Sequence, residues 1–168
     1  RNSIGLVLQE PFLYHGTIAS NIRMYHEELT DEEIRQAAAF VDVADFIESL
    51  PGGYDHSVTE RGSTLSTGQR QLLAFARTIA AQPKILILDE ATANIDQETE
   101  EMIQNSLKKM RQGRTTIAIA HRLSTIQDAD CIYVLDKGKI IESGNHDQLI
   151  ALGGTYKKMY DLQAGMMK

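Results

Sequence analysis

The sequence predicts an α/β fold in which a helical segment is followed by a mostly parallel sheet. Residues 9–82 show helix caps and amphipathic periodicity, whereas residues 83–144 alternate apolar strands with helices. Residues 145–168 carry two closing helical patterns. We therefore expect a single domain over residues 1–168 that is divided into these three parts.

Short elements are expected in the first half of the chain. The apolar run at residues 4–8 predicts a buried strand, and Pro11 lies just after it and restricts the chain. Thr30 and Glu33 have the spacing of a capping box. Polar residues 56–63 predict a loop, and helices are expected over residues 17–24, 30–41, 43–50 and 68–80.

Strands dominate the prediction for the second half. The continuous apolar run at residues 84–89 predicts a strand buried on both faces of a parallel sheet. Asp136-Lys137-Gly138 indicates a hairpin between two apolar runs. The other expected elements are a helix over residues 96–110 with Asp96 as its N-cap, a strand at 115–120, and helices at 145–152 and 156–166.

Composition narrows the function classes. Apolar residues make up 42% and charged residues 24%, which is ordinary for a globular protein, and the net charge of −6 argues against a nucleic-acid partner. The single cysteine, Cys131, lies in an apolar run, so we expect it to be buried in a protein of a reducing compartment. No apolar stretch approaches the roughly 18 residues of a membrane span. Because the chain begins at Arg1 with a strand close behind, we expect it to be cut from a longer protein.

Two carboxylates stand where a parallel sheet binds ligands. Asp89 and Glu90 end the strand expected at residues 84–89, and ligands bind at the carboxyl ends of such strands. Phosphoryl transfer needs a carboxylate to hold Mg²⁺ and a polar group to orient water, roles that suit Asp89 and Glu90 respectively. The simpler interpretation is an acidic strand end followed by a solvated loop.

Ser66-Thr67-Gly68-Gln69 opens the strongest amphipathic helix. Backbone amides at a helix start favour anions, and glycine lets a phosphate approach the backbone. The simpler interpretation is a Ser/Thr N-cap. Two further polar residues follow expected strands: Gln9 after the first one and His121 after the strand at 115–120. An amide suits magnesium or water, and an imidazole suits a phosphate oxygen, although each residue alone is weak support.

Taken together, these motifs resemble the nucleotide-binding domain of ABC exporters, a P-loop NTPase fold, over nearly the whole chain. Leu65 to Gln69 match the signature loop, and Asp89 with Glu90 matches the Walker B strand and catalytic glutamate. The remaining matches are the Q-loop Gln9, the exporter-type loop Thr59-Glu60-Arg61-Gly62, the D-loop Ala93-Asn94-Ile95-Asp96 and the switch histidine His121.

The resemblance implies ATP and Mg²⁺ as ligands and a head-to-tail dimer of two such domains. Glu90 would polarise the attacking water, His121 would steady the γ-phosphate, and Gln9 with Asp89 would hold Mg²⁺. The residues implied at the nucleotide are Gln9, Leu65, Ser66, Thr67, Gly68, Gln69 and Asp96. The implied partners are a second nucleotide-binding domain and a transmembrane domain of the same parent chain, at the cytoplasmic face of the cell membrane.

Three departures from the family pattern matter. No G-x-x-x-x-G-K-[ST] loop occurs in the 168 residues, so the isolated chain is expected to be inactive as an ATPase. Thr67 stands where the family has glycine: the change either weakens the site, which favours a heterodimer, or is a tolerated variant. Asn94 departs from the common D-loop, with no direction assigned to its effect.

Two other functions remain open. One is a soluble, non-transport ABC ATPase, which the acidic chain and the short interval between Gln9 and Ser66 disfavour. The other is a non-catalytic interaction fragment, which describes the isolated chain and is compatible with a parent that is an exporter.

Overall fold

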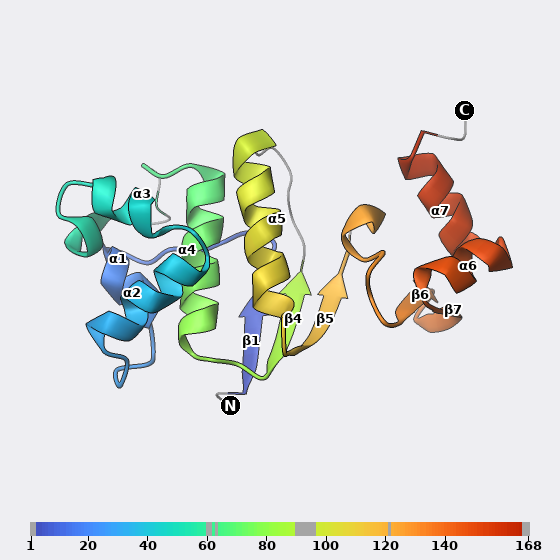
Figure 1. The fold of residues 1–168 in the computed structure, drawn as a ribbon, viewed down its shortest axis with the longest axis horizontal. Helices are drawn as coiled ribbons and strands as arrows, with labels where there is room; N and C mark the ends of the chain where they lie inside the picture. Colours follow the sequence, from blue (N-terminus) through green and yellow to red (C-terminus); the bar gives the residue numbers. More distant parts are fainter. Residues whose placement is uncertain (1–2, 60–61, 63, 90–96, 121, 166–168) are drawn as a thin grey trace. The chain divides into compact units, whose positions relative to one another are not determined.

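The structure, a computed structural model, describes residues 3–59, 62, 64–89, 97–120 and 122–165. The chain divides into two compact units, Arg1–Ile119 and Ala120–Lys168. Unit 1 holds a parallel sheet and helices α1 to α5, and unit 2 holds a hairpin and helices α6 and α7 (Figure 1). The division of the domain near residues 82 and 144 stays a prediction.

The sheet of unit 1 has three parallel strands in the order β1-β4-β5. They are β1 (Ile4–Val7), β4 (Ile85–Asp89) and β5 (Thr115–Ile119). Leu88 of β4 lies opposite Val7 on one side and Ala118 on the other. The predicted parallel sheet is therefore confirmed, and the carboxyl ends of all three strands meet at one edge.

The prediction that the strand at residues 84–89 is buried on both faces holds fully for one face only, since Ile85 and Ile87 on the other face are half-buried. Leu86 and Leu88 point to the core, but the alternate residues of β1 and β5 are open, with Leu6 52% and Ile117 56% exposed. Helices α4 and α5 share a core with Val7, Leu86 and Leu88 and so cover one face only. A continuous apolar run indicates that both faces of a strand are apolar. It does not indicate that other elements cover both faces.

Helix α4 (Thr67–Ala80) lies at the centre of unit 1 and contacts four other elements. They are α1 (Ile18–Arg23), α2 (Asp31–Phe40), α5 (Gln97–Arg111) and β1. Its predicted apolar face is confirmed, since it buries Leu72, Leu73, Ala76, Ile79 and Ala80. Asp96, the expected N-cap of α5, lies outside the described residues.

Local sequence signals predicted the smaller helices of unit 1 correctly. Thr30 accepts from the amide of Glu33 at 3.3 Å, and Glu33 accepts from the amide of Thr30 at 2.8 Å, which confirms the capping box of α2. Helix α3 (Ala44–Ser49) follows. The polar stretch expected to be a loop contains β3 (Ser57–Val58), which pairs with β2 (Gly16–Thr17). Two-residue strands are too short to show an alternation in sequence.

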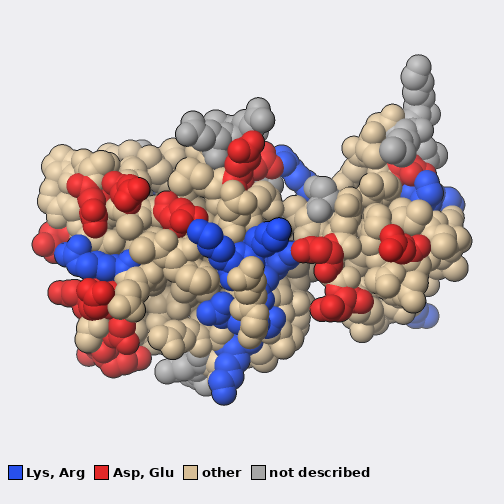
Figure 2. All heavy atoms as spheres, viewed as in Figure 1, with Lys and Arg blue, Asp and Glu red and all other residues tan. Residues whose placement is uncertain are grey.

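Charges on α5 follow the helix dipole. Its last turn carries Lys108, Lys109 and Arg111, and Figure 2 shows basic side chains gathered over this part of unit 1. Lys109 also pairs with Asp42 at 2.5 Å, and the buried hydroxyl of Ser106 donates to Val41 O at 3.0 Å. These two contacts fasten α5 to the end of α2.

Unit 2 is built on the predicted hairpin. Strands β6 (Ile132–Asp136) and β7 (Lys139–Gly144) are joined by Lys137 and Gly138, which both have positive φ as a type I′ turn requires. Helices α6 (His146–Leu152) and α7 (Thr155–Gln163) follow. Cys131 is exposed, so its predicted burial is wrong: it precedes β6, and the buried alternation begins at Ile132. Within the described ranges, no helix is long and apolar enough to cross a membrane.

Glu142 of β7 caps helix α7 from outside the helix. Its carboxylate accepts from the amides of Tyr156, at 3.0 Å, and Thr155. A Cβ on residue 154 would collide with this carboxylate, so Gly154 makes room for it. The amide of Tyr156 lowers the pKa of Glu142 most, against an opposing effect of burial, and the amide of Thr155 lowers it further.

We predict that unit 2 loses stability in acid through this cap. Because the folded-state pKa of Glu142 lies below its ordinary value of 4.5, the stabilisation is complete above that value and is lost as the pH falls through the folded-state pKa. Glu142→Gln should remove this part of the pH dependence in urea unfolding of unit 2. The matched change Glu27→Gln, an exposed carboxylate of unit 1, should leave it intact, and an unchanged pH profile in Glu142→Gln would contradict the assignment.

Candidate nucleotide site

The predicted anion-binding residues form the first turn of α4. Ser66 is the N-cap: its hydroxyl accepts from the amide of Gln69 at 3.1 Å, and the Gln69 side chain accepts from the amide of Ser66 at 2.9 Å. Leu65 is buried, whereas Ser66 is exposed. The simple capping interpretation is therefore correct for Ser66 and Gln69 as local structure. The Ser-x-x-Gln spacing carried this signal in the sequence.

Capping leaves two backbone amides at the start of α4 without a partner in the helix, those of the exposed Thr67 and the buried Gly68. The amide of Gln69 is taken by Ser66, but the amides of Thr67 and Gly68 have no acceptor within the helix because they precede its first full turn. The dipole of this 14-residue helix adds positive potential at the same end. The first turn of α4 is thus suited to bind a phosphate.

Arg70 braces this turn, and the sequence reasoning missed it. Its guanidinium donates to Leu65 O at 2.6 Å, to Gly62 O at 3.4 Å and to the Thr67 hydroxyl at 3.0 Å. Thr67, the residue that departs from the family pattern, is exposed, and its hydroxyl is held by the Arg70 guanidinium. No sequence signal predicts such a brace, since two of its three acceptors are backbone carbonyls.

Gln9 and Asp89 lie at neighbouring strand ends. Asp89 is the last residue of β4 and half-buried, and Gln9 follows β1 by two residues and is exposed. Since Val7 is in register with Leu88, both side chains stand at the carboxyl edge of the sheet. Glu90, Asp96 and His121 lie outside the described residues, as do Glu60 and Arg61.

Two oxygen donors at one edge of the sheet suit Mg²⁺, which can bind through few protein oxygens, better than they suit a metal ion that is coordinated by protein side chains alone. In the described part of the chain, no group of three or more His, Cys, Asp or Glu side chains is placed to hold a metal ion. Mg²⁺ is commonly bound by one or two protein oxygens together with substrate phosphates and water. The carboxylate of Asp89 and the amide oxygen of Gln9 suit that mode of binding.

The two groups of residues lie at the same end of unit 1. Helix α4 and strand β4 are joined by a short connection and run in opposite directions, so the first turn of α4 and the end of β4 point the same way (Figure 1). Among the residues that the structure describes, no hydrogen bond joins the signature residues to Gln9 or Asp89. The structure therefore brings together the members of each group, but not the two groups.

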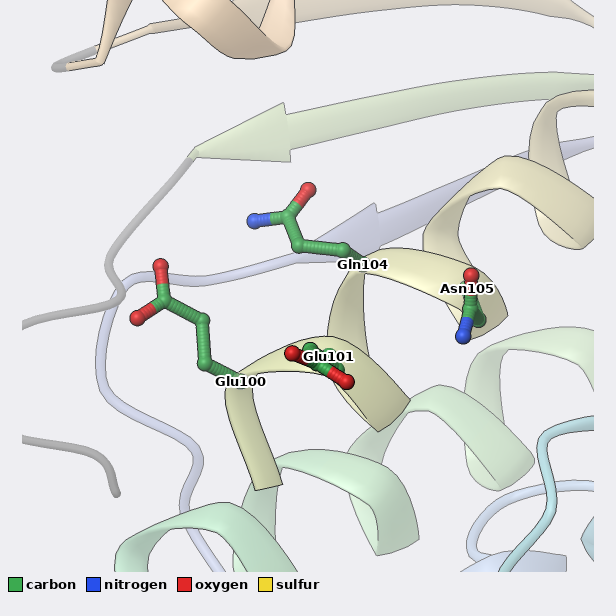
Figure 3. A pocket seen from close by; sticks show the side chains of 4 residues that line it. All are labelled: Glu100, Glu101, Gln104 and Asn105. Carbon is green, nitrogen blue, oxygen red and sulfur yellow. The ribbon is translucent and has the colours of Figure 1, made fainter. Parts of the chain in front are cut away.

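A shallow hollow lies on α5, lined by Glu100, Glu101, Gln104 and Asn105 (Figure 3). All four residues come from one helix, and Glu100 and Gln104 extend to the same side of it. None of these four lining residues is cationic, so the hollow offers no positive side chain to a phosphate, and we do not assign the nucleotide to it.

Comparison with known proteins shows the family to which the chain belongs. The family described as "ABC transporter" matches residues 1–93, which is more than half of the chain. The chain belongs to the ABC transporter family. Relatives match over nearly its whole length: exp8 of Streptococcus pneumoniae, named as an ABC transporter ATP-binding protein, is 76% identical over 99% of the chain. YheH of Bacillus subtilis, named as a multidrug resistance ABC transporter ATP-binding/permease protein, is 55% identical over 98%.

A solved structure agrees with this assignment. A bacterial Atm1-family ABC exporter with ATP bound is similar over 98% of the chain, with a TM-score of 0.87 and 44% identity. This similarity confirms the predicted fold class, the ABC type of P-loop NTPase fold. The chain spans 28% of the length of exp8, 24% of YheH and 29% of the exporter structure.

We predict that the cap of α4 contributes measurably to stability. Ser66→Ala removes the acceptor for the Gln69 amide and should lower the free energy of unfolding by about 1 kcal/mol. Ser66→Ala combined with Gln69→Ala should cost less than the sum of the single changes, because the two side chains form one reciprocal cap. Urea unfolding measures both effects. Ser49→Ala, at the exposed end of α3, is the control, and an equal loss there would contradict a specific role for Ser66.

Proposed function

We propose that this chain is the C-terminal part of the ATP-hydrolysing motor domain of an ABC exporter, which couples hydrolysis at a dimer interface to export across a membrane. The observation that carries the proposal is the placement, at the same end of unit 1, of a capped helix start suited to phosphate and a strand edge that carries Asp89, with Gln9 beside it. The names of the relatives support ATP binding and transport. The partners would be a second nucleotide-binding domain and a transmembrane domain of the same parent chain, with this part at the cytoplasmic face of the membrane.

Each side chain has a distinct part in the proposed reaction. Asp89 and Gln9 would hold Mg²⁺, which when bound neutralises charge on the phosphates. Glu90 would accept a hydrogen bond from the attacking water and draw its proton away, and His121 would donate to the γ-phosphate. Asp96 would line the nucleotide at the dimer interface.

The signature residues would act on the nucleotide of the partner domain. The amides of Thr67 and Gly68 and the hydroxyl of Ser66 would donate to its γ-phosphate, while Leu65 and Gln69 keep the turn in shape. The 168 residues contain no G-x-x-x-x-G-K-[ST] loop. We therefore propose that turnover requires such a loop from elsewhere and that the isolated chain does not hydrolyse ATP.

Thr67 bears on the kind of dimer. A Cβ with a branched hydroxyl stands at the first position of α4, where the family has glycine, and it is held there by Arg70. We propose that it weakens the site which this chain completes for its partner. A weakened signature together with an intact Glu90 favours a heterodimer in which this chain supplies the competent glutamate.

The first test is the hydrolytic residue. In the full-length protein that carries this chain, Glu90→Gln should lower kcat for ATP by about 10²- to 10⁴-fold while ATP binding is kept, because only the water-activating group is lost. Phosphate release and nucleotide binding are measured side by side. Glu101→Gln, a carboxylate of the α5 hollow, should leave kcat unchanged. Unchanged turnover in Glu90→Gln would overturn the proposal.

The second test concerns Thr67. Thr67→Gly should raise ATP turnover in the full-length protein, because the backbone then approaches the γ-phosphate without a side chain in between. Thr67→Ser keeps both the Cβ and the hydroxyl that Arg70 holds, so it should leave the rate near that of the unchanged protein. Equal rates in Thr67→Gly and the unchanged protein would count against a weakened site.

A further inference from the structure

The seven residues that begin at Gln9 form an irregular connection, the Gln9 segment (residues 9–15), between β1 and β2. Leu13 is fully buried and anchors its middle, whereas Phe12 and Tyr14 are 43% and 45% exposed. These two rings meet edge to face with centroids 4.9 Å apart. The segment thus has one buried side chain and a pair of outward aromatic rings.

Backbone groups of the Gln9 segment are bound by one buried amide. Asn21 of α1 is 3% exposed, and its Oδ1 accepts from the amide of Tyr14 at 2.7 Å. Its Nδ2 donates to Tyr14 O at 2.9 Å and to Thr17 O at 3.0 Å. Asn21 therefore replaces the strand partner that Tyr14 would have in a sheet.

Arg77 of α4 ties this arrangement to the signature helix. Its Nε donates to Asn21 O at 2.7 Å, one Nη donates to Phe12 O at 2.9 Å, and the other donates to Asn21 Oδ1 at 3.1 Å. Its guanidinium carbon lies 5.8 Å from the centre of the Tyr14 ring. One planar fork thus joins α4, α1 and the Gln9 segment.

As a source of folding stability alone, the arrangement around Arg77 is unfavourable. Burial lowers the pKa of Arg77, and within the described ranges no carboxylate pairs with it. A cation held only by neutral acceptors pays for its desolvation, whereas an apolar side chain of similar length would fill the space without that cost. What the guanidinium adds is fixed geometry among three separate pieces of chain.

We propose that Arg77 is a positioning residue for ATP hydrolysis: it fixes the Gln9 segment to α4, so that Gln9 and the signature turn keep one relative position. This inference rests on the proposed function for its catalytic consequence. The anchor and the signature share one continuous helix, with Thr67 at its first position and Arg77 ten residues later. A shift of the Gln9 segment would therefore be transmitted through α4 to its first turn.

The test uses the full-length protein and three variants: Arg77→Gln, Gln9→Ala and both changes together. Arg77→Gln should speed hydrogen exchange of the Tyr14 amide by about tenfold or more, because the brace on Asn21 and Phe12 is lost. It should also lower kcat for ATP. In the double variant, kcat should fall to no less than about half that of Gln9→Ala, because a positioning residue has nothing left to position.

Arg114 offers a matched control. It also donates to three backbone carbonyls, those of Pro83 at 3.0 Å, Met110 at 2.9 Å and Gln112 at 3.4 Å, but it does not touch the Gln9 segment. Arg114→Gln should leave Tyr14 exchange unchanged, and its effect on kcat should be additive with Gln9→Ala. Where Arg77→Gln prevents folding, Arg77→Lys is used. It keeps the charge but cannot span Phe12 and Asn21 together, so the same changes are expected at a smaller size.

Two results would overturn the inference: unchanged Tyr14 exchange in the Arg77 variant, or additive losses of kcat in the double variant. Failure of the proposed function looks different. The unchanged full-length protein would then not hydrolyse ATP, or Gln9→Ala would leave kcat unaltered, while the exchange measurement would still decide whether Arg77 holds the segment.

Discussion

Burial of α4 on nearly all sides is the constraint on which unit 1 depends. The helix contacts α1, α2, α5 and β1, and each buried Leu, Ile or Phe side chain on it contributes about 1.5–3 kcal/mol. Polar side chains along the body of this helix, such as Arg77 and Thr78, hydrogen-bond to neighbouring segments. In its first turn, Ser66 and Gln69 form the cap, and the Arg70 guanidinium donates to Leu65 O and to the Thr67 hydroxyl. The same packing fixes the direction in which that turn faces.

Polar contacts fix the positions of the loops around α4, which apolar packing alone leaves undetermined. The apolar face of α4 sets its distance from β1 and α2, but apolar contacts do not choose among nearby rotations of a loop. Arg70 and Arg77 make that choice, because each spreads several directional donors over carbonyls of different segments. Arg70 holds the first turn of α4, and Arg77 holds the Gln9 segment. The two segments are thus fixed to a single helix by the same type of side chain.

Features with a local period or spacing could be predicted from sequence. The capping box at Thr30, the apolar face of α4, the parallel strands and the hairpin turn all follow from residues a few positions apart. Burial could not be predicted in the same way: Leu6 and Ile117 are apolar and yet exposed, because burial depends on which elements cover the sheet. The roles of Arg77 and Asn21 were missed for another reason. Arg77 meets Phe12 across 65 positions through a backbone carbonyl, and any residue at position 12 would offer the same acceptor.

The neutral partners of Arg77 have a consequence for the response to salt. Surface pairs such as Arg23 with Asp31 and Lys109 with Asp42 weaken as ionic strength rises, because mobile ions screen the attraction between opposite charges. The contacts of Arg77 are short hydrogen bonds to carbonyl and amide dipoles in a half-buried position, where dissolved ions have little to screen. The hydrogen bonds between α4 and the Gln9 segment therefore depend little on ionic strength, whereas the surface ion pairs weaken as it rises.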